Sequence, residues 1–250
     1  MRKPTTSERA APGNPAHRAR SLFLFLLILV TAAGGVHWIL QRTPAFDQAG
    51  LPPLPDLLQK VRVTEQRYRV LGYKRDEFGN GWGAAPIDGP DAGCTTRDAA
   101  LRLQSQDYSA TQCRPTAGVL FDPYTQTTIA LAPSASKTVV APAPLEVDHV
   151  IPLAAAWDLG AHEWDPALRR RFANDPLNLV VTSRVANQEK SDSLPAEWLP
   201  PHPAARCWYV RRLAAVARAY DLPLPAADIT TIKRQCWTLK LQLANIGRDK

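Results

Sequence analysis

Short apolar runs and amphipathic stretches alternate along most of this chain, which is typical of a domain that mixes helices and strands. Runs rich in β-branched and aliphatic residues predict strands at 118–121, 125–131, 145–150 and 177–182. Helical spacing and capping residues predict helices at 99–103, 167–173, 184–190, 206–220 and 226–243. The pattern therefore indicates an α+β fold in which a strand, an excursion, a second strand and a helix follow one another between residues 145 and 190.

The first 40 residues have a different pattern. Residues 1–20 are a basic leader, and Ser21 to Leu40 contain the wholly apolar core LFLFLLILV. One interpretation is a signal peptide cleaved after Ala32 or Ala33. The other is a retained transmembrane anchor with Trp38 at the outer interface and the N-terminus inside. Both interpretations place residues 45–250 outside the cytoplasm, secreted or held at the membrane by residues 21–40.

Composition changes this picture little. A hydrophobic fraction of 45% and a charged fraction of 21% over 250 residues describe a globular protein with enough chain to bury a core. The formal net charge is +7, but the basic leader contains five basic residues and one acidic residue. The charge excess is therefore mostly a topogenic signal and is weak evidence for a nucleic-acid partner. The prolines of residues 41–60 predict a linker, followed by a single domain at 61–250.

Four cysteines, Cys94, Cys113, Cys207 and Cys236, fit an exported domain because thiols tend to pair in an oxidising compartment. Four cysteines allow three pairings, and we favour Cys94 with Cys113 and Cys207 with Cys236, since each pair is close in sequence. The alternative, a four-cysteine zinc site, expects ligands paired at short spacing, which this chain lacks. No structural zinc is expected.

Candidate chemistry begins at the strand segment Val147-Asp148-His149-Val150. Histidine suits deprotonation of an attacking water near neutral pH, and a divalent cation suits stabilisation of a phosphodiester and its leaving oxygen. Adjacent strand residues point to opposite faces, so Asp148 and His149 can share a site only if the strand bends or ends there. The following Ile151-Pro152 supports an early end.

Polar residues downstream complete the candidate site. Asn178, in the returning strand, can bridge backbone groups and hold the intervening loop in shape. Asn187 lies on the predicted helix at 184–190, where its amide oxygen pairs with Asp148 as a sparse ligand set for Mg²⁺ or Mn²⁺. Lys190 lies three positions further on the same helical face and is a candidate phosphate contact, as are Arg184 and Arg97. For Trp82 and Tyr124, core packing is favoured over base stacking.

The stretches VDHVIPL and ANDPLNLVVTSRVANQEKSD resemble the HNH, or ββα-metal, endonucleases, including the HNH domain of RNA-guided CRISPR nucleases. More closely, the chain resembles exported HNH proteins related to the C-terminal nuclease domain of GmrSD-type restriction enzymes. FGNGW, CTTRD, DPYT, FANDP and EWLPP extend this resemblance over roughly Tyr68 to Cys236. It implies a ββα-metal core at 145–190 with flanking helices and a small β-hairpin.

The resemblance also implies roles for individual residues. His149 is implied as general base and Asn178 as the residue that orders the motif loop, with Asp148 and Asn187 as metal ligands. Asp in the first position and Asn in the last suit a hard cation better than zinc. The implied reaction is hydrolysis of DNA or RNA that leaves a 5′-phosphate.

We therefore predict an extracytoplasmic, Mg²⁺- or Mn²⁺-dependent endonuclease of low sequence specificity, with DNA favoured over RNA and no obligate protein partner. Two alternatives remain open at the level of sequence. One is an exported nucleic-acid-binding or envelope interaction module that keeps the HNH frame without catalysis. The other is a nuclease toxin effector delivered to rival cells.

Overall fold

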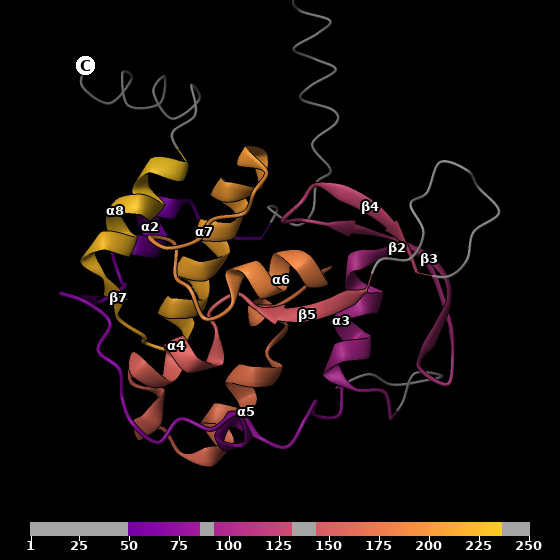
Figure 1. The fold of residues 1–250 in the computed structure, drawn as a ribbon, viewed down its shortest axis with the longest axis horizontal. Coiled ribbons are helices and arrows are strands. Elements are labelled where there is room, and N and C mark those ends of the chain that lie inside the picture. The colour runs from indigo at the N-terminus through magenta and orange to yellow at the C-terminus, as the bar shows by residue number, and fades with distance from the viewer. Residues whose placement is uncertain (1–49, 86–92, 132–143, 237–250) are drawn as a thin grey trace, which may run out of the picture. The chain divides into compact units, whose positions relative to one another are not determined.

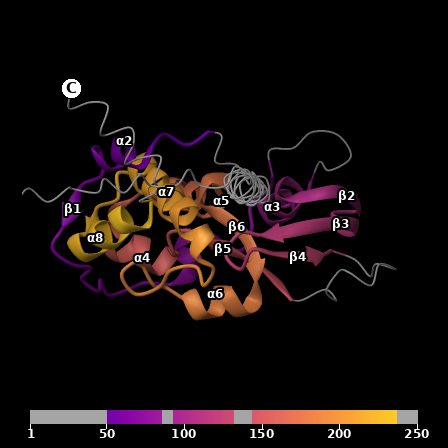
Figure 2. The ribbon, with the colours of Figure 1, turned by 90° about the horizontal axis from the view of Figure 1, so that it is seen from above.

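The computed structural model describes residues 50–85, 93–131 and 144–236. Within these residues the strands form three small sheets (Figures 1 and 2). The first pairs β1 (Val63–Thr64) with β7 (Leu224–Pro225) in parallel, and the second consists of antiparallel β2 (Ser105–Thr111), β3 (Arg114–Asp122) and β4 (Thr127–Ala130). The third pairs β5 (Leu145–His149) with β6 (Leu179–Ser183), which are antiparallel. The α-helices are α2 (Leu54–Leu58), α3 (Thr96–Gln104), α4 (Leu153–Asp158), α5 (Pro166–Asn174), α6 (Arg184–Lys190), α7 (Pro203–Ala219) and α8 (Ala226–Gln235). The expected α+β class is confirmed.

The β5–β6 pair carries the candidate site. Its register pairs Asp148 with Val180 and His149 with Leu179, and β6 leads directly into α6. The Ser183 side chain accepts a hydrogen bond from the Ala186 amide, which caps α6 at its first turn. The chain between the two strands forms α4 and α5, which is the excursion expected from the sequence.

Two apolar clusters stabilise the fold. The larger one is built around α7, whose Tyr209, Val210 and Leu213 are fully buried, and it includes residues of α2, α4 and α5. The smaller one consists of buried residues from α3, β3, β5 and β6: Leu101, Leu120, Val147, Leu179 and Val181. Both figures show α3 beside the β2–β4 sheet. Because side chains alternate along a strand, β5 contributes Val147 and the partly buried Leu145 to the smaller cluster.

The expectation of a linker over residues 41–60 is wrong for the part that the structure describes. Residues 54–58 form α2, with Leu54 and Leu57 buried in the larger cluster, and α2 packs against α7. Pro at the first turn and two leucines three positions apart give this short segment a helical start and one apolar face. The segment before residue 50 lies outside the described residues.

The N-terminal predictions cannot be compared with the fold, since the leader at 1–20 and the signal or anchor segment at 21–40 lie outside the described residues. In the part of the chain that is described, no helix is long and apolar enough to cross a membrane. The helix predicted at 226–243 is described as far as Gln235.

The side chain of Gln104, at the end of α3, lies along the outer edge of β6. Its amide oxygen accepts from the Val181 amide at 2.9 Å, and its amide nitrogen donates to the Val181 carbonyl. The same nitrogen donates to the carbonyl of Phe121 in β3 at 3.2 Å. Gln104 therefore satisfies edge groups that a neighbouring strand would otherwise pair, and joins the β2–β4 sheet to the β5–β6 pair.

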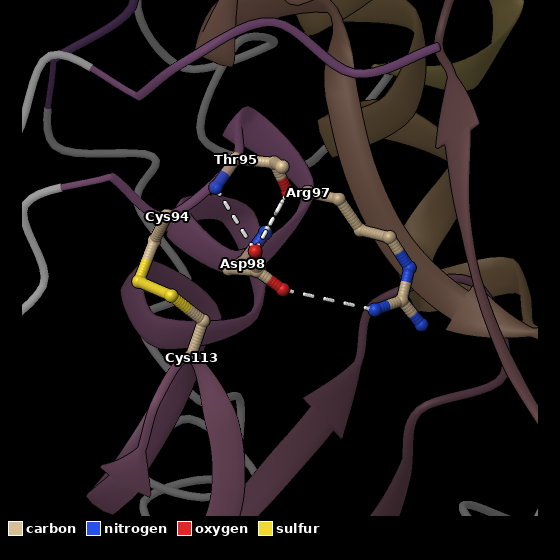
Figure 3. The surroundings of a disulfide bond; sticks show 5 residues. All are labelled: Cys94, Thr95, Arg97, Asp98 and Cys113. Carbon is tan, nitrogen blue, oxygen red and sulfur yellow. Dashed lines mark hydrogen bonds and ion pairs between the residues drawn. A yellow bond between two sulfur atoms is a disulfide. The ribbon is translucent and has the colours of Figure 1, made fainter.

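Both cysteine pairs are the ones favoured from the sequence. Cys94 is bonded to Cys113 and Cys207 to Cys236. Figure 3 shows the first disulfide beside the start of α3, where Thr95 and Asp98 form a reciprocal capping box. The disulfide therefore ties the first turn of α3 to the loop between β2 and β3.

Candidate active site

Strand β5 places the side chains of Asp148 and His149 on opposite faces. The β5–β6 register continues without interruption through both residues, so the strand does not bend between them; it ends at His149, which is the early end expected from Ile151-Pro152. Asp148 contacts Lys190 and Tyr124, whereas His149 contacts Ala173 and Trp82. The two residues that the sequence suggested for one site therefore lie in two environments that share a strand.

The imidazole of His149 is held by the end of α5. Its Nε2 lies 2.8 Å from the carbonyl oxygen of Ala173. A carbonyl oxygen only accepts, so Nε2 carries the proton and Nδ1 keeps a free lone pair. The indole of Trp82 stacks on the ring, with centroids 5.6 Å apart and an interplanar angle of 13°. This arrangement presents Nδ1 as a proton acceptor.

Burial lowers the pKa of His149 to about 3, and the positive charges of Arg75 and Lys190 act in the same direction, against the hydrogen bond to Ala173. The side chain is 6% exposed. The imidazole is consequently neutral at neutral and mildly acidic pH and can accept a proton, but so low a pKa makes it a weaker base than a histidine whose pKa lies near the working pH.

His149 opens onto a pocket of about 120 Å³ between the 75–82 segment and α5. The pocket is lined by Arg75, Asp76, Phe78, Gly79, Gly81, Trp82, His149, Leu153 and Ala173. Arg75 is exposed at this pocket and brings a cation close to the imidazole. The pocket thus contains both the neutral imidazole of His149 and the positive charge of Arg75, a combination suited to binding a phosphate group.

Asn178 is fully buried and fixes the chain directly after β5. Its side-chain oxygen accepts from the Ile151 amide at 2.9 Å, and its side-chain nitrogen donates to the Ile151 carbonyl at 3.3 Å. The Asn178 carbonyl also accepts from the Val150 amide at 2.8 Å. These bonds hold Val150 and Ile151, the two residues that follow His149, against the start of β6.

On the other face of β5, Asp148 is paired with Lys190 of α6. Lys190 Nζ donates to Asp148 Oδ1 at 2.9 Å and to the His149 carbonyl at 2.7 Å. The hydroxyl of Tyr124 donates to Asp148 Oδ2 at 2.7 Å. Burial raises the pKa of Asp148 against the opposing effect of Lys190, and burial lowers the pKa of Lys190 against the opposing effect of Asp148.

Lys190 does not occupy the position that a phosphate contact requires. Its side chain is 0% exposed, because α6 packs this residue into the interior beside Asp148. Helical spacing placed Lys190 on the same face of α6 as Asn187, and that face packs against β5, where Lys190 is buried. The ammonium group is therefore a partner of Asp148 rather than a surface cation.

Asn187 and Arg184 meet Glu146 at the more open end of the same face. Asn187 Nδ2 donates to Glu146 Oε2 at 2.8 Å, and Arg184 Nε donates to Oε1 at 2.9 Å. The Arg184 side chain is 52% exposed. Asn187 thus lies beside Glu146, two residues along the strand from Asp148.

Arg97 lies on α3, a different element from the β5 and α6 residues that form this face. Its guanidinium lies 3.9 Å from Asp98, as Figure 3 shows, and its side chain is 42% exposed. Among the described residues, no hydrogen bond or ion pair joins Arg97 to His149 or Asp148. Arg97 is not among the residues that line the His149 pocket.

The donor types beside α6 suit a hard divalent cation, since Glu146, Asp148 and Asn187 offer carboxylate and amide oxygens. The packing of Asp148 does not suit one. Both of its oxygens are engaged and the Lys190 ammonium lies 2.9 Å from Oδ1. A cation at Asp148 requires Lys190 or Tyr124 to give up its contact.

One other group of possible ligands lies within the described residues. Cys94, Asp98 and Cys113 bring their ligand atoms within 4.8 Å of one another. The two sulfurs are bonded to each other in a disulfide, so neither is available as a metal-binding thiolate. This group is explained by the disulfide.

Sequence reasoning missed the groups that hold the two candidate residues in place. Ala173 acts through its backbone carbonyl, which no side-chain pattern reveals. For Trp82 and Tyr124, core packing was expected, but their partners, His149 and Asp148, were not. The segments FGNGW, DPYT and FANDP, which contain these residues, were the available signal.

Comparisons with known proteins give a consistent result. The family of the C-terminal domain of GmrSD restriction endonucleases matches residues 98–223. A protein of Arthroderma benhamiae described as an uncharacterized secreted protein is 34% identical over 172 residues, which cover 66% of this chain and 76% of the relative. No solved structure matches. The family match spans half of the chain and includes β5, β6 and α6, and the chain therefore belongs to the family of the GmrSD restriction endonuclease C-terminal domain.

Proposed function

We propose that this protein is an endonuclease that hydrolyses phosphodiester bonds of nucleic acid, with His149 as its general base. The observation that carries the proposal is the fixed, neutral imidazole of His149, whose Nε2–H is bound to the Ala173 carbonyl. Membership of the GmrSD C-terminal domain family supports nuclease chemistry and a nucleic-acid substrate.

The proposed proton transfer uses Nδ1 of His149. A water molecule in the pocket gives one proton to Nδ1 as its oxygen attacks the phosphorus atom, the bond from phosphorus to the 3′ oxygen breaks, and the leaving 3′ oxygen takes a proton from solvent. The Ala173 carbonyl stabilises the imidazolium through the Nε2–H bond, and Nδ1 then returns its proton to solvent. Arg75, which lines the same pocket, supplies a cation for the phosphate. Asn178 keeps Val150 and Ile151 in place and so preserves the position of His149 at the end of β5.

The family generally uses a divalent metal ion, and we propose Mg²⁺ or Mn²⁺ here, with Asp148 and Asn187 as ligands. Such an ion would supply positive charge to a phosphate and its leaving oxygen. Asp148 lies on the face of β5 opposite His149, so the ion and the His149 base can act on one phosphate only if the end of β5 rearranges. The contacts of Lys190 and Tyr124 with Asp148 oppose this assignment, whereas the half-buried Asn187 is not constrained in that way. Asn187 is therefore the better-supported ligand of the two.

For the substrate we propose DNA in preference to RNA, cleaved with low sequence specificity. The family description names restriction endonucleases, which favours DNA. Arg184 and Arg97, both largely accessible, remain proposed contacts to the nucleic-acid backbone. We propose an extracytoplasmic location, because the relative is described as secreted and the chain contains two disulfides.

The decisive experiment measures cleavage of plasmid DNA and of RNA by the purified chain with Mg²⁺, Mn²⁺ or chelator. We expect cleavage with a divalent ion and its loss in His149→Ala. The matched control is His162→Ala, because His162 also binds a backbone carbonyl, that of Trp157, through a ring nitrogen at 2.8 Å. Full cleavage by His149→Ala would refute the general-base assignment.

A further inference from the structure

Trp82 covers one face of the His149 imidazole. The two rings are nearly parallel, at 13°, with centroids 5.6 Å apart. Trp82 is half-buried and lines the same pocket as His149 and Arg75. Trp82 also packs against the smaller apolar cluster, so the indole lies between that cluster and the imidazole of His149.

The backbone before Trp82 is shaped to deliver this contact. Gly79 and Gly81 have φ angles of 103° and 77°, which residues with a Cβ rarely adopt. A Cβ at Gly79 would lie 3.0 Å from Cγ of Arg170, so the segment also passes close to α5. Phe78 anchors the start of the segment in the larger core cluster. The two glycines let the chain turn between this anchor and the indole.

The end of α5 holds both partners at once. Ala173 accepts from His149 Nε2, and the next residue, Asn174, accepts through Oδ1 from the Gly83 amide at 2.8 Å and from the Thr96 hydroxyl at 2.6 Å. Gly83 directly follows Trp82. Consecutive residues of one helix terminus therefore fix the imidazole and the backbone that carries the indole.

These two restraints are complementary. The hydrogen bond to Ala173 fixes the direction of Nε2 within the ring plane, while stacking of the indole restricts rotation of the ring out of that plane. A base must be held in a narrow geometry to be effective, and displacement by about 1 Å can cost roughly 10²-fold in rate. The hydrogen bond alone leaves rotation about its axis open.

We propose that Trp82 is a positioning residue that fixes the plane of the His149 imidazole, with Asn174 anchoring the segment that carries it. This inference rests on the proposed general-base function of His149. Trp82 acts on the reaction through His149 and does not itself exchange a proton.

The test compares Trp82→Leu with Trp82→Phe in the full chain. Trp82→Leu removes the stacked ring, so we expect kcat for plasmid nicking to fall about 10- to 100-fold with KM within about twofold of the original value. Trp82→Phe keeps an aromatic face and should recover most of this loss. The matched control is Trp164→Leu. Trp164 is a half-buried tryptophan that contacts Phe172 and Tyr220, and its substitution should leave kcat unchanged.

A second measurement does not depend on cleavage. In the original chain the indole ring current shifts the His149 ring C–H resonances upfield in the NMR spectrum, and Trp82→Leu should move them downfield, as should Asn174→Ala to a smaller extent. Unchanged resonances or an unchanged kcat in a folded Trp82→Leu variant would overturn the proposal. Persistent cleavage by His149→Ala would instead refute the proposed function, while the resonances would still report whether Trp82 orders the ring.

Discussion

Asp148 and Lys190 form an ion pair inside the protein, with the carboxylate Oδ1 2.9 Å from the ammonium nitrogen and side-chain exposures of 5% and 0%. Removing one member of such a pair leaves the other charge without compensation in the interior. We therefore expect Asp148→Asn to lower the free energy of unfolding by about 3–5 kcal/mol, as measured by urea denaturation. Loss of activity in this variant would then reflect unfolding as much as chemistry.

Two further variants make this prediction specific. Glu146→Gln, on the same face of β5, breaks a pair with the exposed Arg184 and should cost no more than about 1 kcal/mol. The double variant Asp148→Asn with Lys190→Met should be more stable than Asp148→Asn alone, because the uncompensated ammonium is gone. If Asp148→Asn, Glu146→Gln and the double variant all lowered the free energy of unfolding by the same small amount, the buried Asp148–Lys190 pair would not stabilise the fold as proposed.

Asn178→Ala should destabilise the segment after β5. The substitution leaves the amide and carbonyl of Ile151 without their partners in the interior, at a cost of about 1–3 kcal/mol for each group. Thermal unfolding measures the total loss, and Gln188→Ala, on the exposed side of α6, is the control. A change no larger than that of Gln188→Ala would show that Asn178 does not hold this loop.

Asn187→Ala tests the proposed metal site without disturbing the buried pair. Loss of one oxygen ligand should weaken affinity for the ion, so we expect activity to fall most at low Mg²⁺ or Mn²⁺ and to recover as the ion concentration rises. Measured across a metal titration, the midpoint should move to higher concentration. An unchanged midpoint alongside normal folding would exclude Asn187 as a ligand.

Asp192 should contribute to stability only above acidic pH. Burial alone would raise its pKa, but the hydrogen bond and charge of Arg67, with the charge of Arg69, lower the pKa below the usual 3.8. A pKa that is lower in the folded state stabilises the fold above the unfolded value, and this stabilisation is lost as the pH falls through the folded value. Asp192→Asn should therefore flatten the decline of Tm in this acidic range.

The control for this pH dependence is Asp221→Asn. Asp221 pairs with Arg62, but their side chains are 77% and 60% exposed, so its removal should hardly change Tm at any pH. A decline in Tm that is as steep in Asp192→Asn as in the original chain would contradict the contribution of Asp192.

The order of elements around β5, β6 and α6 could be predicted because local signals agreed there. Ser183 caps α6 at the residue expected, and the apolar strand before it pairs with β5 in the register that buries Val181. Strand β2 was not predicted, since its sequence SQDYSAT is polar and its place in the sheet depends on pairing with β3. Helix α2 was missed because its prolines indicated a linker.

The sequence predicted which residues belong to the candidate site better than it predicted how these residues lie relative to one another. The sequence placed His149 near the end of one strand and Asn178 in the returning strand, whereas Asn178 ends the 3-10 turn Pro176–Asn178 just before β6. Alternation predicted that Asp148 and His149 would separate unless the strand bent or ended there. Whether it bends depends on pairing with β6, which is a tertiary contact. The burial of Lys190 likewise depends on how closely α6 packs, which helical spacing does not determine.

The contacts of Gln104 bear on whether another copy of this chain can pair with the edge of β6. A strand edge with free amides and carbonyls is a template on which another chain can add a strand. By engaging both backbone groups of Val181, one glutamine side chain closes the outer edge of β6 at its middle residue. Protection of this edge against intermolecular strand addition thus depends on the side chain of a residue from α3.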